Sequence, residues 1–179
     1  MSFAFSRRSF LKYTAVAAVA VAGASLFTGC KVDTSDSYNA LRTTPGELTV
    51  LQVTAAMGTY VEASKSYTAP DVTGMTIAFP FKITNGRANP IYVNPNNFKA
   101  TVLDAEGKVI LAKYTAINGL TLDAPLCDTN LKKGASVSGN VNLTLGAALE
   151  PGQSVVLTYC PDLQYNEYSL NWKTTRAKD

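Results

Sequence analysis

Large apolar residues recur at every second position in two long stretches of this chain, residues 74–86 (GMTIAFPFKITNG) and residues 136–145 (SVSGNVNLTL). The alternating positions are Met75, Ile77, Phe79, Phe81 and Ile83 in the first stretch, and Val137, Gly139, Val141, Leu143 and Leu145 in the second. Because successive side chains of a strand point to opposite faces of a sheet, this period predicts two strands with one buried and one solvated face. Pro80 lacks an N–H group, so we expect the first strand to lie at a sheet edge there or to contain a bulge.

Shorter apolar runs predict further strands, separated by residues that favour turns. The runs are residues 48–56, 91–94, 98–104, 108–116, 154–160 and 168–173, and the turn signals are Asn85-Gly86, Asp104–Gly107, Lys133-Gly134 and Pro151-Gly152. No segment of ten or more residues keeps the period of an amphipathic helix. The pattern therefore predicts an all-β domain over residues 47–176, an immunoglobulin-like two-sheet β-sandwich, with a Greek-key barrel as the alternative. Trp172, in period with Tyr168 and Leu170, is predicted to lie in its core.

Residues 1–29 do not share this alternation. Basic residues precede residues 14–27, which contain no charge but number only 14, whereas a membrane-spanning helix needs about 20. A basic segment, a short apolar segment and a small-residue site are typical of a cleaved signal peptide, and a buried N-terminal helix is the alternative. Residues 6–12, SRRSFLK, resemble the twin-arginine export signal at Arg7, Arg8, Phe10 and Leu11, which implies export of an already folded protein. An ordinary secretory leader that contains two arginines is the competing interpretation.

Residues 26–30, LFTGC, resemble a lipobox. The resemblance implies cleavage after Gly29 and a lipid on the thiol of Cys30, and two long acyl chains anchor a protein stably in a membrane. Cleavage after Ala24 would instead release a soluble, secreted protein. Residues 30–46 are mostly polar and are predicted to form a short flexible tether before the sandwich.

With Cys30 assigned to the lipid, two of the three cysteines remain, Cys127 and Cys160. Outside the cytoplasm a cysteine pair is commonly oxidised, so we expect a disulfide between them. Two independent buried thiols are the alternative, because the sequence does not show whether the two Cα atoms come within bonding range.

The chain contains no histidine, which limits the chemistry available to it. Ser-His-Asp triads, zinc sites of the HExxH kind and the usual copper sites of sandwich proteins all require that residue. Beyond the leader no S-x-x-K motif occurs either, so we predict that the protein is not an enzyme and binds no cofactor or metal. Asp123, Asp128 and Asn130 place oxygen ligands around Cys127, but they lack the spacing of a calcium-binding loop.

The formal net charge of +3 belongs to the leader. Arg7, Arg8 and Lys12 have no acidic neighbour before Cys30, and beyond Cys30 the basic and acidic residues are equal in number. A neutral body lacks the field that attracts a phosphate backbone, so nucleic-acid binding is excluded.

The order of strands and turns resembles the DUF4352-type family of bacterial exported proteins. The resembling segments, within about residues 47–173, are residues 81–85 (FKITN), 91–93 (IYV), 98–104 (FKATVLD) with Gly107, 131–134 (LKKG) and 137–141 (VSGNV). The resemblance implies an immunoglobulin-like sandwich at the cell envelope, with roles in adhesion, protein binding or stress at the surface, and no assigned chemistry.

Tyrosines are the candidate binding residues of this chain. Tyr60 and Tyr67 lie in a predicted loop over residues 57–71, and Tyr165 and Tyr168 lie near the C-terminus. Tyrosine offers a large contact area with a polar group at low entropic cost, which suits recognition, although these rings could instead cap the ends of the sandwich.

The prediction from sequence is therefore a lipid-anchored extracytoplasmic protein, at the outer face of the cytoplasmic membrane or in the cell envelope. We expect it to act as a binding or accessory module for a protein or glycan partner. An enzyme or enzyme-complex subunit with an unrecognised site, and a soluble secreted antigen-like protein, are the alternatives.

Overall fold

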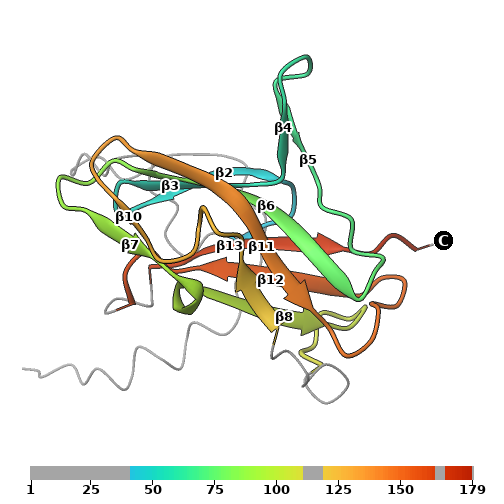
Figure 1. The fold of residues 1–179 in the computed structure, drawn as a ribbon. Coiled ribbons are helices and arrows are strands. Elements are labelled where there is room, and N and C mark those ends of the chain that lie inside the picture. The colour runs from blue at the N-terminus through green and yellow to red at the C-terminus, as the bar shows by residue number, and fades with distance from the viewer. Residues whose placement is uncertain (1–40, 111–118, 164–167, 179) are drawn as a thin grey trace, which may run out of the picture. The chain divides into compact units, whose positions relative to one another are not determined.

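The computed structural model describes residues 41–110, 119–163 and 168–178. These residues form an all-β fold with two main sheets that enclose one core, which confirms the predicted sandwich (Figure 1). The elements are β1 (Leu41–Arg42), β2 (Gly46–Val50), β3 (Val53–Met57), β4 (Thr59–Val61), β5 (Ser66–Thr68), β6 (Thr76–Asn85), β7 (Ile91–Val93), the 3-10 turn η2 (Pro95–Asn97), β8 (Phe98–Leu103), β9 (Gly119–Leu122), β10 (Thr129–Leu131), β11 (Ser136–Thr144), β12 (Ser154–Tyr159) and β13 (Leu170–Thr175).

The two main sheets have five and four strands. The five-stranded sheet has the order β2-β3-β6-β11-β9, and the four-stranded sheet has the order β1-β13-β12-β8. Two smaller sheets are formed by β10 with β7 and by β4 with β5. Among the described residues, no helix is long and apolar enough to cross a membrane.

The two alternating stretches form β6 and β11, which pair antiparallel from Thr76↔Thr144 to Thr84↔Ser136. Ile77, Phe79 and Ile83 are fully buried, as their period predicts. Met75 is the exception: it lies just before the first strand residue and is 50 % exposed, so the buried face of β6 begins at Ile77.

Pro80 lies at a partial sheet edge, as expected. The ladder between β3 and β6 ends at Met57↔Phe81, so only β11 pairs with the part of β6 from Thr76 to Pro80. The carbonyl oxygen of Pro80 accepts a hydrogen bond from Gly58 N at 2.8 Å, on the side of β6 that faces β3. The missing N–H of Pro80 therefore faces the side where no further strand pairs.

The predicted single strand over residues 48–56 is instead a hairpin. β2 and β3 pair antiparallel around a two-residue turn, Leu51-Gln52, in which both residues have positive φ (49° and 60°). Two positive φ values are the geometry of the turn that best matches the twist of a hairpin, but this turn usually contains Asn or Gly. Leu and Gln gave no such signal in the sequence.

The hairpin turn predicted at Asp104–Gly107 is confirmed. Oδ1 of Asp104 accepts from the backbone N–H groups of Glu106 (3.1 Å) and Lys108 (2.7 Å), and Gly107 has a φ of 84°. Beyond the turn, Val109 makes only an isolated bridge to Leu103. The remainder of the strand predicted over residues 108–116 lies outside the described residues from residue 111 onward.

The first strand, β1, lies inside the segment that the sequence assigned to the tether. Leu41 and Arg42 pair parallel with Asn171 and Trp172 of β13. The sheets therefore include residues that precede the predicted domain boundary at residue 47.

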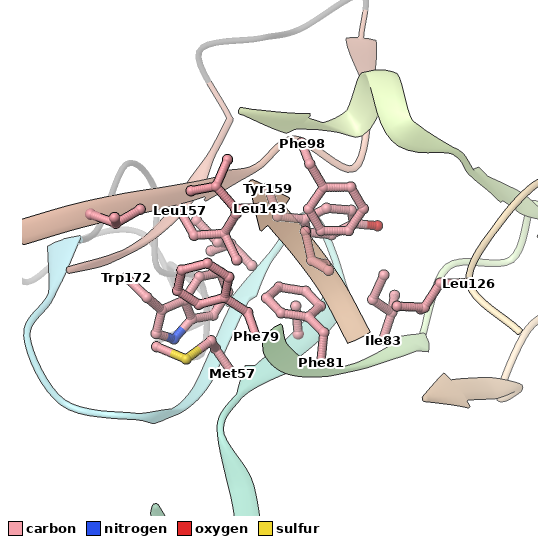
Figure 2. Packing of buried hydrophobic residues seen from close by; sticks show 14 of the residues in the cluster. Met57, Phe79, Phe81, Ile83, Phe98, Leu126, Leu143, Leu157, Tyr159 and Trp172 are labelled. Carbon is pink, nitrogen blue, oxygen red and sulfur yellow. The ribbon is translucent and has the colours of Figure 1, made fainter. Parts of the chain in front are cut away.

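An aromatic cluster occupies the middle of the core between the two sheets (Figure 2). The ring of Phe81 makes edge-on contacts with Phe98, Tyr159 and Trp172, with centroid distances of 5.4, 5.8 and 5.2 Å. Trp172 is fully buried, as predicted, and its Nε1 donates to the carbonyl oxygen of Gly46 at 3.0 Å. This bond joins β13 to the start of β2.

The predicted disulfide between Cys127 and Cys160 is absent from the structure, and the two residues have different surroundings. Cys160 follows β12 and is buried, and its backbone oxygen accepts from Nδ2 of Asn97 at 2.8 Å. Cys127 lies before β10, and its Sγ contacts the exposed Oδ2 of Asp128 at 3.6 Å. Desolvation raises the pKa of both thiols.

Candidate functional site

The predicted loop over residues 57–71 contains a hairpin, β4–β5, that projects from the five-stranded sheet (Figure 1). The chain leaves the sheet at Gly58, which has a φ of 106°. A Cβ atom at this position would lie 2.5 Å from the carbonyl oxygen of Thr68, so only glycine fits the close approach. In the hairpin, Thr59, Tyr60 and Val61 pair with Thr68, Tyr67 and Ser66.

Tyr60 and Tyr67 lie directly opposite each other on this hairpin. Their ring centroids are 5.1 Å apart and the rings are tilted by 60°. Tyr60 is 48 % exposed, whereas the hydroxyl of Tyr67 donates to Oε1 of Glu47 on β2 at 2.7 Å. Tyr67 therefore joins the hairpin to the sheet, and it leaves the Tyr60 ring available at the surface.

The surroundings of Tyr67 favour its protonated form. Burial, followed by the hydrogen bond and the negative charge of Glu47, raises the pKa of Tyr67 to about 12. The hydroxyl consequently remains a donor to Glu47 over the whole neutral pH range.

A groove runs along the base of the hairpin, on the face of the five-stranded sheet that is opposite the core. Its volume is about 800 Å³. The residues that line it on the sheet and hairpin include Glu47, Tyr60, Tyr67, Pro80, Lys82, Ser138 and Asn140. Because side chains alternate across a strand, the register that buries Phe79 and Phe81 places Pro80 and Lys82 on this outer face.

The strand register fixes the order of the charged and polar groups across the groove. Glu47 pairs with Ala56, Ala56 with Lys82, and Lys82 with Ser138, so that one row crosses β2, β3, β6 and β11. The small side chain of Ala56 separates the acidic group from the basic one. Within the part of the chain that the structure describes, neither the Lys82 ammonium nor the Ser138 hydroxyl has a hydrogen-bond partner.

Asp123, which follows β9, binds the groove residue Asn140 and fixes its side chain. Its Oδ2 accepts from the backbone N and from Nδ2 of Asn140 (2.9 and 2.8 Å), and its Oδ1 accepts from Nδ2 of Asn142 (2.9 Å). The hydrogen bonds from Asn142 and Asn140 hold the pKa of the Asp123 carboxyl below its ordinary value. The bond from Nδ2 of Asn140 to Asp123 fixes the orientation of this amide, so that Oδ1 can accept from a ligand and the second hydrogen of Nδ2 can donate to one.

The oxygen ligands that flank Cys127 in the sequence do not form one cluster. Asp123 binds the two asparagines of β11, whereas Oδ1 of Asp128 accepts from the hydroxyl of Tyr92 at 2.9 Å. In the described ranges, no group of three or more potential metal ligands comes together.

The other predicted site residues do not join the groove. Tyr168 is partly buried and packs against the core. Tyr165 lies outside the described residues, as do the export signal at Arg7, Arg8, Phe10 and Leu11 and the lipidation site at Cys30.

The sequence interpretation missed Glu47, Lys82, Ser138 and Asn140 as groove residues. In the sequence these residues occupy the polar positions of the same alternation whose apolar positions identified the core. The alternation shows which residues face outward, but it does not show which of them become neighbours across the sheet.

The fold and the site thus define an all-β sandwich whose surface groove, beside a tyrosine-bearing hairpin, has a mixed polar and apolar lining. No protein-family model matches the chain, and no curated protein matches it in sequence.

Two solved structures from Bacillus subtilis are weakly similar. One is a putative lipoprotein, ycdA, of B. subtilis subsp. subtilis str. 168, with a TM-score of 0.43 and 13 % identity; the match covers 74 % of this chain and 39 % of that chain. The other is the yjhA protein, with a TM-score of 0.43 and 10 % identity, and the match covers 75 % of this chain and 98 % of that chain. The matched part of the present chain therefore spans 39 % of the length of ycdA.

Proposed function

We propose that this protein is a binding module that is exported, anchored by a lipid on Cys30, and engages a ligand outside the cytoplasm through hairpin β4–β5 and the adjacent groove. The observation that most supports the binding role is the Tyr60–Tyr67 pair. The hydrogen bond from Tyr67 to Glu47 holds the pair beside the groove. The Tyr60 ring is half exposed and does not belong to the core, so packing does not account for it. Exposed aromatic rings on a rigid support are typical of recognition surfaces.

The proposed location follows from the leader. The paired Arg7 and Arg8 resemble an export signal, and residues 26–30 resemble a lipobox that ends at Cys30. The resemblance of residues 47–173 to DUF4352-type exported proteins supports the same location.

A binding role accounts for the groove better than catalysis does. The groove contains an amine and a hydroxyl, Lys82 and Ser138, which lie opposite each other in the register. Both residues are exposed and no hydrogen bond joins them, whereas a lysine that acts as a base needs burial to lose its charge and contact with its nucleophile. We therefore propose that the protein is not an enzyme.

Site-specific photo-cross-linking on intact cells tests the proposed surface. Benzoylphenylalanine replaces Tyr60 in one strain and Tyr92 in another. Tyr92 is similarly exposed, at 53 %, but it lies on β7 and does not line the groove. We expect cross-linked products from position 60 that are absent from position 92. The same products from both positions, or none from position 60, would contradict the proposal.

A further inference from the structure

We infer that the groove beside hairpin β4–β5 binds an uncharged oligosaccharide, with one sugar ring stacked on Tyr60. This inference rests on the proposed function, because it names the ligand class of the same site. The ligand class follows from the chemistry of the groove wall and floor.

The groove wall offers a supported aromatic face. Tyr60 is half exposed, and the tilted ring of Tyr67, 5.1 Å away, lies behind it. Tyr67 is in turn held by Glu47, so the ring against which Tyr60 packs is tied to the sheet. The C–H face of a sugar ring carries partial positive charge and therefore packs favourably on the negative face of an aromatic ring.

The groove floor offers donors and acceptors in close succession. The Lys82 ammonium can only donate, the Ser138 hydroxyl can donate and accept, and Oδ1 of Asn140 can only accept. Sugar hydroxyl groups both donate and accept, so they match this mixed set. A ligand with donors only or acceptors only would leave part of the set unsatisfied.

The charges of the groove favour an uncharged ligand. Glu47 and Lys82 lie in the same row on either side of Ala56, so a ligand in the groove meets one negative and one positive group. The electrostatic field of Glu47 offsets that of Lys82. The groove therefore attracts a polyanion or a polycation less than a groove lined by charges of one sign would.

The backbone of the groove does not favour a peptide strand. Strand addition needs unpaired N–H and C=O groups, but Pro80 has no N–H and its oxygen already accepts from Gly58 N. Across the floor, β6 and β11 pair with each other at Lys82↔Ser138 and Pro80↔Asn140. An amphipathic helix would need a predominantly apolar groove, whereas the floor of this one includes the polar side chains of Lys82, Ser138 and Asn140.

The volume of about 800 Å³ suits a ligand of a few sugar rings. It lies within the range of about 300–1,000 Å³ that is usual for sites binding small molecules. The site is thus large enough for one ring on Tyr60 and further rings above Lys82 and Ser138.

The test is isothermal titration calorimetry on the full chain in detergent. Candidate ligands are taken from an array of neutral oligosaccharides, with a heparin tetrasaccharide as the anionic control and decaproline as the control for an aromatic groove that binds proline-rich peptides. We expect binding of a neutral oligosaccharide that is about tenfold weaker in Tyr60→Ala and in Lys82→Met, and little changed in Tyr60→Phe and Tyr92→Ala. Unchanged thermal unfolding of each variant excludes loss of the fold as the cause.

The outcomes separate this inference from the proposed function. If no neutral oligosaccharide binds at millimolar concentration, or if heparin or decaproline binds instead, the oligosaccharide inference is wrong, while cross-links from position 60 would still support a binding surface. If an oligosaccharide binds equally well to Tyr60→Ala, the assignment of the ligand to this groove is wrong.

Discussion

Trp172 links the two sheets through one hydrogen bond and one ring contact. Its ring meets Phe81 edge-on, and its Nε1 donates to Gly46 at the start of β2. Replacing it by phenylalanine leaves a cavity and a buried carbonyl oxygen that lacks its partner. Both effects destabilise the folded state.

We predict that Trp172→Phe lowers the free energy of unfolding by about 2 kcal/mol. Urea unfolding followed by circular dichroism measures the change, because the variant lacks the only tryptophan of the chain. The control is Tyr92→Phe, which loses an exposed hydrogen bond to Asp128 and should change stability by less than about 0.5 kcal/mol. Equal effects of the two substitutions would show that the Trp172 contact does not stabilise the sandwich.

Tyr67 provides a second prediction at this scale, because its pKa reports the contact with Glu47. The pKa is raised from 10.0 to about 12, first by burial and then by the hydrogen bond and charge of Glu47. The folded state holds this proton more tightly than the unfolded state. The resulting stabilisation is therefore complete below about pH 10 and is lost as the pH rises through about 12.

We expect Glu47→Gln to lower the pKa of Tyr67 toward its ordinary value without reaching it, since desolvation by burial remains. NMR titration of protein labelled with ¹³Cζ-tyrosine follows the single resonance that disappears in Tyr67→Phe. A pKa that stays at about 12 in Glu47→Gln would mean that Glu47 does not hold the hairpin in solution.

Among the elements, the clearest alternation gave the most reliable predictions. β6 and β11 contain ten and nine residues, so the period was long enough to identify both strands. One face of β6 is buried throughout, whereas in β11 Val141 and Leu143 are buried and Val137 and Gly139 are half-buried. β9 and β10 contain four and three residues, which is too short for a period to be recognised. The β2–β3 hairpin was hidden because Leu51 and Gln52, rather than Gly or Asn, adopt positive φ.

The candidate site was only partly predictable for a related reason. Tyr60 and Tyr67 were visible as aromatic residues in a polar segment, although that segment forms a hairpin rather than a loop. Glu47, Lys82 and Ser138 come from three separate strands, and only the register Glu47↔Ala56↔Lys82↔Ser138 makes them neighbours. Such a register depends on tertiary packing, which a single sequence does not display.

Gly58 determines where hairpin β4–β5 leaves the sheet, and its replacement by alanine should disturb the site. The new Cβ would lie 2.5 Å from Thr68 O, at a φ of 106°. We predict a loss of about 2 kcal/mol in stability, from strain and from the displaced hairpin, together with weaker ligand binding.

Gly107→Ala is the matched control for this effect. Gly107 also has a positive φ, 84°, but nothing lies within 4 Å of a Cβ atom there. It should cost about 1 kcal/mol from backbone conformation alone and leave ligand binding unchanged. Chemical denaturation and the cross-linking yield from position 60 measure the two effects. Equal results for both glycines would show that the close approach of Gly58 to Thr68 is not what positions the hairpin.

For the whole molecule, the proposed anchor and the proposed binding site belong to different parts of the chain. The groove residues lie between Glu47 and Asn140, whereas the export signal and Cys30 precede all the described residues. A substitution in the leader should therefore change where the protein is found without changing what it binds.

Cys30→Ser tests this separation, because serine keeps the size of the side chain but removes the thiol that a lipobox cysteine presents for acylation. We predict that the variant passes from the membrane fraction to the soluble extracytoplasmic fraction, since loss of two acyl chains removes about 0.8 kcal/mol for each buried methylene. The released protein should still give the cross-linked products of position 60. Cys127→Ser is the matched control, because Cys127 is also a thiol, and it should leave membrane association unchanged.

Mass spectrometry of the parent protein should find acylated Cys30 at its N-terminus. If Cys30→Ser remains as firmly membrane-bound as the parent, the anchor is not a lipid on this residue. An N-terminus at Ser25 would instead show that cleavage follows Ala24 and that the parent protein is released.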